Sequence, residues 1–237
     1  MKGLLRICIL CVTFLGSYNN SFGQGYSKDS PVIRFSSHNG MMVDINQIDS
    51  SNFNSFQNDS YKDEHYETFE DGVKTESELS KQHPDIFRKT KGAYIFPLEN
   101  GDTIRLKKIT QDEDLQGMMD YKFIGQFENF TVIYADGYEW WCYYLVDLNG
   151  KTNYSIPGEP KFNNYTKTVI GWDNYYGNSD LSIIDLEYNH DCIVSFDNYE
   201  IDGFKTANTV IVLKLSNSVE SGLKSIYFRI SWDKFMK

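Results

Sequence analysis

From Ala93 to the C-terminus, short apolar runs alternate with turn residues in a pattern typical of antiparallel β-structure. Asn100-Gly101 and Asn149-Gly150 each separate two such runs, and an Asn-Gly dipeptide is the strongest local signal for a β-hairpin. The pattern predicts an all-β domain over 91–237, built as an antiparallel meander of hairpins, with helix confined to one turn at 111–119. The further strand-like runs are 121–125, 130–135, 143–148, 152–156, 168–172, 181–186, 192–196, 209–215 and 225–231.

Residues 24–90 are polar, lack a sustained apolar pattern and are interpreted as a partly disordered linker. One exception is 32–43, where an Asn-Gly dipeptide separates two apolar runs and predicts a further hairpin. The stretch 44–66 has too little apolar surface to fold alone. In 77–89, Pro84 interrupts any long helix, so we expect a short helix or a turn there.

Residues 1–23 have the features of a secretory signal peptide. A basic start precedes an apolar run over 7–15, which is too short to span a bilayer. Small residues stand one and three positions before Gln24, so we expect cleavage there and no membrane span in the mature chain. The residues before Cys11 lack the small side chain of a lipidation signal, so no lipid anchor is expected. The sequence predicts export to the periplasm, the cell surface or the extracellular medium.

The net charge of the chain limits the classes of partner that it can bind. The chain of 237 residues carries a net charge of −10. Residues 1–23 contain Lys2 and Arg6 and no acid, so cleavage leaves 21 basic against 33 acidic residues, a net charge of −12. Binding to nucleic acid depends on Lys and Arg that displace counterions from phosphates, so this balance excludes a nucleic-acid partner. It suits a basic protein partner attracted by electrostatic steering.

Cleavage also removes two of the four cysteines and leaves Cys142 and Cys192. In an oxidising compartment, two cysteines suggest one disulfide. The alternative is a pair of buried thiols, because cysteine is among the residue types most often buried. Both cysteines lie in strand-like apolar runs, which suits either interpretation.

The stretch 143–186 carries a resemblance to a known repeat. An apolar strand ends in Asp147-Leu148-Asn149-Gly150-Lys151, a Pro160-Lys161-Phe162 corner follows, and a second strand ends in Ile184-Asp185-Leu186. This resembles a TolB-type β-propeller repeat, although Asn163-Asn164-Tyr165-Thr166 replaces its Ser-Pro-Asp-Gly turn. The span 138–230 is also similar to uncharacterised secreted β-rich proteins of Bacteroidota. Propellers need four or more blades, and 93–237 supplies about three, so the resemblance implies an incomplete propeller-like or sandwich arrangement and no activity.

Two oxygen-rich loops are candidate calcium sites. The loop 112–117 begins like an EF-hand, but Phe123 occupies the twelfth position, where a bidentate Glu is required, so an EF-hand is excluded. The second loop offers Asp173, Asn178 and Asp180, yet any loop between strands uses the same residue types. The four histidines are scattered and no nucleophile motif is present, so we expect no metal and no other cofactor.

Aromatic residues make up 16% of the chain and are its most distinctive chemistry. Trp140, Trp141, Trp172, Tyr175 and Tyr176 form a candidate binding surface, because aromatic rings stack on sugars and anchor protein partners. Neighbouring residues on a strand point to opposite faces, so one of the two adjacent tryptophans is expected in the core.

Three hypotheses about function follow. The first is an exported, non-catalytic binding or interaction module whose ligand is a protein or a glycan. The second is a secreted carbohydrate-active or ester hydrolase that uses Asp or Glu residues, which requires a cleft with convergent carboxylates. The third is a structural protein of the cell envelope, with the polar N-terminal segment as a tether. Catalytic residues cannot be assigned from the sequence.

Overall fold

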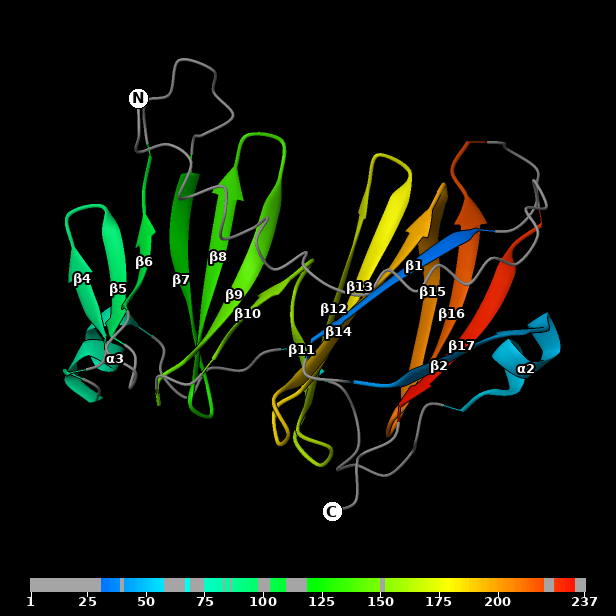
Figure 1. The fold of residues 1–237 in the computed structure, drawn as a ribbon, viewed down its shortest axis with the longest axis horizontal. Coiled ribbons are helices and arrows are strands. Elements are labelled where there is room, and N and C mark those ends of the chain that lie inside the picture. Colours follow the sequence, from blue (N-terminus) through cyan, green and yellow to red (C-terminus); the bar gives the residue numbers. More distant parts are fainter. Residues whose placement is uncertain are drawn as a thin grey trace.

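A computed structural model describes residues 31–38, 41–57, 67–68, 75–82, 84–85, 87–97, 103–109, 119–149, 152–219 and 224–232. Strands dominate these residues and pair antiparallel throughout, which confirms the all-β prediction. Four sheets stand face to face in a row, without closing into a ring (Figure 1). The signal-peptide prediction, the calcium-like loop 112–117 and most of the helical turn at 111–119 lie outside the described residues.

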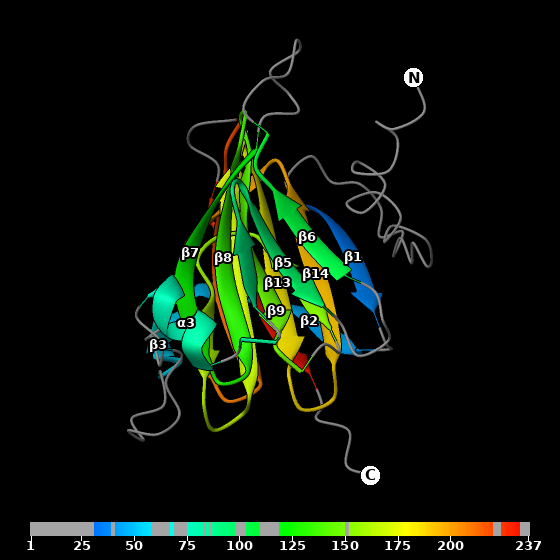
Figure 2. The ribbon, with the colours of Figure 1, turned by 90° about the vertical axis from the view of Figure 1, so that its left-hand side faces the viewer.

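The sheets are numbered here in their order along the row, and the view from one end shows them stacked behind one another (Figure 2). Sheet 1 contains β4 (Arg88–Thr90), β5 (Ala93–Pro97) and β6 (Thr103–Lys107). Sheet 2 contains β7 (Met119–Phe127), β8 (Phe130–Gly137), β9 (Trp141–Asp147) and β10 (Asn153–Ile156). Sheet 3 has the order β1 (Val32–His38), β14 (His190–Asp197), β13 (Asn178–Asp185), β12 (Thr168–Tyr175), β11 (Lys161–Asn163) and β3 (Glu67–Thr68). Sheet 4 has the order β15 (Tyr199–Ala207), β16 (Val210–Asn217), β17 (Ile226–Trp232) and β2 (Val43–Ile48).

Two of the Asn-Gly hairpins are confirmed by the strand pairing. The strands β5 and β6 pair across 100–101, and β9 and β10 pair across 149–150. A short helix, α3 (Glu76–Gln82), overlaps the start of 77–89 and ends before Pro84, as expected. Thr75 caps its N-terminus, because the Glu78 backbone N–H donates to Thr75 Oγ1, and the Thr75 hydroxyl donates in turn to Glu78 Oε2.

The hairpin predicted over 32–43 is wrong. Strand β1 pairs with β14 in sheet 3, whereas β2 pairs with β17 in sheet 4. The linker interpretation of 44–66 is also wrong for its first part, which forms most of β2 and the helix α2 (Ser50–Ser55). These segments are too polar to fold alone, but residues 190–232 supply the apolar surface that their alternating Ile and Val side chains need.

Each gap between neighbouring sheets holds its own apolar core. Between sheets 1 and 2 the buried residues are Leu79, Phe87, Tyr94, Phe96, Leu106, Ile133, Val146 and Leu148. Between sheets 2 and 3 they are Phe130, Val132, Leu145, Tyr154, Ile156, Val169 and Ile184. Between sheets 3 and 4 they are Met41, Ile170, Leu181, Ile183, Cys192, Val194, Phe196, Tyr199, Ile201, Ile211, Leu213, Leu215, Phe228, Ile230 and Trp232. Sheets 2 and 3 therefore contribute apolar side chains from both faces, which accounts for their nearly continuous apolar runs.

Within the described part of the chain, neither helix is long and apolar enough to cross a membrane.

Candidate functional site

The chain packs tightly where it passes from sheet 2 to sheet 3. A Cβ on Gly158, which has a φ of +68°, would overlap the carbonyl oxygen of Trp172 on β12. A Cβ on Gly171 would lie 2.8 Å from the carbonyl oxygen of Pro157 and would overlap the side chain of Ile156. The two glycines thus allow the connection between β10 and β11, together with the Ile156 side chain, to pack directly against β12.

Beyond this contact, the face of sheet 3 that looks toward sheet 2 changes from apolar to polar. Val169 and Ile184 belong to the core between the two sheets, and alternation along β12 and β13 places Asp173 and Asp180 on the same face. These two aspartates are direct cross-strand partners. Asp180 is in turn paired with Ser195 of β14, and Ser195 with Arg34 of β1. A row of polar side chains therefore crosses four strands.

Sheet 2 faces this row with aromatic side chains. Tyr134 of β8 and Tyr143 of β9 are cross-strand partners, with ring centroids 5.1 Å apart. The pKa of Tyr134 is raised mainly by burial, and then by the charges of Asp136 and of Asp173 in the opposite sheet. Burial also raises the pKa of Tyr143, with a smaller contribution from Glu159. The tyrosine pair thus lies within electrostatic range of the polar row.

We call this region the interlayer site and define it by Arg34, Tyr134, Tyr143, Asp173, Tyr175 and Asp180. The Tyr175 hydroxyl donates to Asp180 Oδ2 at 3.0 Å, and burial together with that carboxylate raises the pKa of Tyr175 to about 12. The other carboxylate oxygen, Asp180 Oδ1, is buried and accepts no hydrogen bond from the described residues. Arg34 donates to Asp197 Oδ1 through Nη2 at 2.6 Å and Nε at 3.2 Å. One buried carboxylate oxygen is therefore left without a hydrogen-bond donor among the described residues.

The hairpin that carries the aspartates is held from behind by sheet 4. Asn174 and Ser179 point away from sheet 2, on the opposite face of the hairpin. The Ile201 backbone N–H donates to Asn174 Oδ1 at 3.0 Å, and Asn174 Nδ2 donates to the Ile201 carbonyl at 3.1 Å. The Ser179 hydroxyl donates to Asn174 Oδ1 at 2.6 Å. This anchoring fixes the polar row relative to the sheet behind it, as a preformed site requires.

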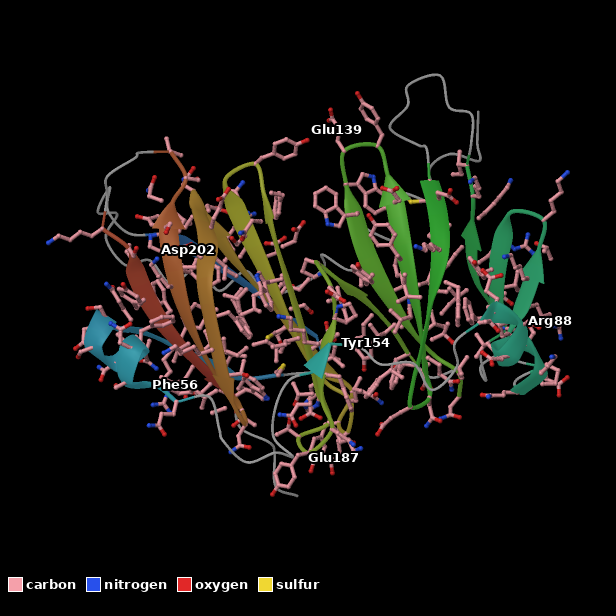
Figure 3. All side chains as sticks on the ribbon, turned by 180° about the vertical axis from the view of Figure 1, so that it is seen from behind. Phe56, Arg88, Glu139, Tyr154, Glu187 and Asp202 are labelled. Carbon is pink, nitrogen blue, oxygen red and sulfur yellow. The ribbon has the colours of Figure 1, made fainter. Side chains whose placement is uncertain are left out.

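Exposed aromatic side chains border the site. Trp141, on the same face as Tyr143, is 44% exposed, and Tyr138 in the preceding turn is 46% exposed. Tyr176, at the tip of hairpin β12–β13, is 80% exposed. The turn that carries Glu139 and the tip of this hairpin lie at the same edge of the molecule (Figure 3). The border therefore presents aromatic surface from both sheets.

The aromatic surface predicted from sequence is divided by the structure. Trp141 and Tyr175 are on the faces that look into the gap between sheets 2 and 3. Trp140 packs against Gly137 beside the β8–β9 turn. Trp172 is on the opposite face of sheet 3, where it stacks on Phe204 with ring centroids 4.3 Å apart. Including Trp172 in the surface was wrong, because the alternation along β12 separates it from Tyr175.

Trp172 takes part in a separate stack of charges and rings. The Lys161 ammonium lies 4.1 Å from the centroid of the Trp172 ring, on the side of sheet 3 that faces sheet 4. Burial lowers the pKa of Lys161, although Glu159 opposes this shift. This cation–π contact stabilises the edge of the fold rather than the interlayer site.

The candidate calcium ligands are only partly assembled. Asp173 and Asp180 are neighbours, but Asn178 Oδ1 accepts the backbone N–H of Asn198 at 2.8 Å. No group of three His, Cys, Asp or Glu side chains suited to a metal ion occurs among the described residues. The two aspartates therefore enter the site as hydrogen-bonding carboxylates.

Cys142 and Cys192 are not joined by a disulfide. Cys142 lies on β9 in sheet 2 and Cys192 on β14 in sheet 3, and both are buried as thiols. Burial raises the pKa of the Cys192 thiol, which keeps it protonated. The structure therefore agrees with the second interpretation of Cys142 and Cys192, a pair of buried thiols.

Replacing Asp173 by asparagine is expected to stabilise the protein at neutral pH. Burial is the main cause that raises the Asp173 pKa above 3.8, with Asp180 adding to it and the Asn174 backbone N–H opposing it. When folding raises the pKa of an acid, the ionised acid destabilises the folded state. This loss of stability grows as the pH rises from the pKa of the unfolded state through the pKa of the folded state. Asp173→Asn should raise the free energy of unfolding by up to about 1 kcal/mol at pH 7, since water screens a half-buried group.

Urea unfolding at pH 7 and pH 3 measures this effect. At pH 3 the carboxyl is protonated in both states, so the gain should disappear. Asp136→Asn, on an exposed carboxylate of β8, controls for the general benefit of removing one negative charge from an acidic protein. Equal gains for the two variants at pH 7 would show that Asp173 carries no burial cost.

Comparison with known proteins finds no matching protein family, no matching curated protein and no matching solved structure. The resemblance of 143–186 to a TolB-type repeat therefore stays a prediction.

Proposed function

We propose that this protein is an exported, non-catalytic binding module and that its interlayer site binds a glycan. The observation that carries the proposal is the arrangement of Tyr134, Tyr143 and Trp141 on one sheet opposite a row of carboxylate and hydroxyl groups on the next. A sugar ring has an apolar face that stacks on aromatic rings and a rim of hydroxyls that donate to carboxylates.

The unsatisfied Oδ1 atom of Asp180 supports this assignment. A buried carboxylate oxygen without a partner is costly, and a ligand hydroxyl that donates to it removes the cost. The nearby guanidinium of Arg34 is paired with the carboxylate of Asp197 and not with that of Asp180. The site is therefore built to receive hydrogen-bond donors, of which a glycan has many.

A glycan array probed with the chain from Gln24 to Lys237 tests the proposal. We expect binding to a restricted set of glycans, weakened about tenfold or more by Trp141→Ala, because the indole supplies stacking area at the border of the site. Tyr165→Ala is the matched control, since Tyr165 is 67% exposed in the β11–β12 turn, away from the interlayer site. A blank array, or equal binding by both variants, would overturn the proposal. A stoichiometric protein recovered by pull-down beside a blank array would replace the glycan with a protein ligand.

Hydrolysis of the same class of ligand is a second candidate, favoured by the cross-strand pair Asp173 and Asp180. Two neighbouring carboxylates, of which Asp173 has a raised pKa, are the groups that glycoside hydrolysis uses. The two candidates differ in one readout. A binding module leaves a bound oligosaccharide intact, whereas a hydrolase releases new reducing ends that Asp180→Asn would abolish.

A further inference from the structure

The outer face of sheet 1 is basic, although the protein as a whole is acidic. Strand pairing places Arg88, Ile95 and Arg105 in one row across the sheet. The next row on the same face ends in Lys107. The inner face of the sheet is the one that enters the core, through Tyr94 and other apolar side chains. The three strands contain no Asp or Glu.

These cations have no ionic partner within the described residues. Arg88, Arg105 and Lys107 are all exposed, and none of the salt bridges in the described part of the chain involves them. In contrast, Lys89 on the inner face of the same sheet pairs with Glu76, and Lys108 just after β6 pairs with Asp120. Lys91, in the β4–β5 turn, adds a fourth exposed charge next to the face.

The position of this face at the end of the row of sheets determines what can reach it. Sheet 1 is the outermost layer at one end of the long axis, and its strands lie nearest the viewer in the end-on view (Figures 1 and 2). Packed sheets are about 10 Å apart, and the Debye length at physiological salt is about 8 Å. A plane of negative charge laid against sheet 1 would therefore meet the cations directly, while the acidic charge of sheets 2 to 4 would be largely screened.

We propose that the outer face of sheet 1 docks the protein on an anionic lipid surface. Guanidinium groups hydrogen-bond phosphate in a planar fork, and clusters of about four or more cations bind anionic membranes. Neighbouring strands are about 4.8 Å apart, so the two arginines stand about 10 Å from each other on either side of half-buried Ile95. Lipid headgroups lie in one plane and diffuse, so they adapt to fixed cations without a matching pocket.

Co-sedimentation of the chain from Gln24 to Lys237 with vesicles tests this docking. We expect binding to phosphatidylcholine vesicles that contain 30% phosphatidylglycerol, loss of binding in high salt, and no binding to pure phosphatidylcholine. The double variant R88Q/R105Q should bind about tenfold or more weakly. The matched control K214Q/R229Q removes two charges from sheet 4, at the other end of the row, and should bind like the unchanged protein.

Three results would overturn the proposal: no binding to anionic vesicles, equal binding by the two double variants, or binding that persists in high salt. Capture of an acidic protein that depends on Arg88 and Arg105, without vesicle binding, would assign the face to a protein partner instead. The proposal is independent of the interlayer site, since R88Q/R105Q should retain glycan binding. Failure of one proposal therefore leaves the other standing.

Discussion

Replacing Gly158 by alanine is expected to lower the free energy of unfolding by about 3 kcal/mol or more. Two costs add at this position. The φ of +68° is a left-handed conformation that costs a residue with a Cβ about 1 kcal/mol. The added methyl would also overlap the carbonyl oxygen of Trp172, so that the connection between β10 and β11 must move away from β12. Urea unfolding followed by circular dichroism measures the loss.

Gly92→Ala is the matched control for this experiment. Gly92 has a φ of +81°, but a Cβ there would have its nearest neighbour, Lys108 Cβ, at 3.9 Å. The control should therefore cost only the backbone term of about 1 kcal/mol. If the two variants lost the same stability, the close contact between the β10–β11 connection and β12 would not exist in solution.

Replacing Ile45 by aspartate is expected to cost about 3 kcal/mol or more, although the surrounding sequence is polar. Ile45 lies on β2, is paired with Ile230 of β17, and packs against the core between sheets 3 and 4. A carboxylate at this position has no partner and must be desolvated beside apolar side chains. Chemical unfolding at pH 7 measures the change.

The neighbouring position supplies the control, because Asn46 is exposed on the other face of the same strand. Asn46→Asp places the same charge one residue further and should change stability by less than about 0.5 kcal/mol. A linker would tolerate both substitutions equally, so equal and small effects would contradict the placement of β2 in sheet 4.

Local patterns in the sequence predict local structure well in this chain. The β5–β6 and β9–β10 hairpins follow from apolar runs on either side of an Asn-Gly dipeptide, since a two-residue turn and its flanking strands are close in sequence. The same signal fails at 32–43, because the partners of those strands are β14 and β17, more than 150 residues away. A local hairpin signal does not show whether the edge strand of a sheet formed far away in the sequence will pair with the segment instead. Here the edges at β14 and β17 offer the larger apolar surface.

The candidate site was predictable only in part. Alternation within a strand explains why Tyr175 and Trp172 point to different sheets, and that rule is readable from the sequence. The sequence does not show that Tyr134 faces Asp173, because this depends on how sheet 2 stacks on sheet 3. Arg34 was also missed, since it lies in a segment predicted to form a local hairpin and reaches the site only through the pairing of β1 with β14.

The same stacking places a polar cluster directly beyond the apolar core of sheets 2 and 3. Gly158 and Gly171 bring the two backbones together at one level, and the apolar core below that level holds the sheets in register. Above it, aspartates and tyrosines replace aliphatic residues, so the facing sides of sheets 2 and 3 become polar. The apolar core and the polar cluster thus occupy successive levels of the same pair of sheets.

Fluorotyrosine NMR during titration with the glycan that binds most tightly on the array tests the interlayer site most directly. Resonances are assigned by Tyr→Phe variants of single positions. Binding in the gap between sheets 2 and 3 predicts shifts for Tyr134, Tyr143 and Tyr175, with no change for Tyr165 in the β11–β12 turn or Tyr227 on β17. Shifts confined to Tyr165 or Tyr227, with the three interlayer tyrosines unchanged, would contradict the assignment of the site.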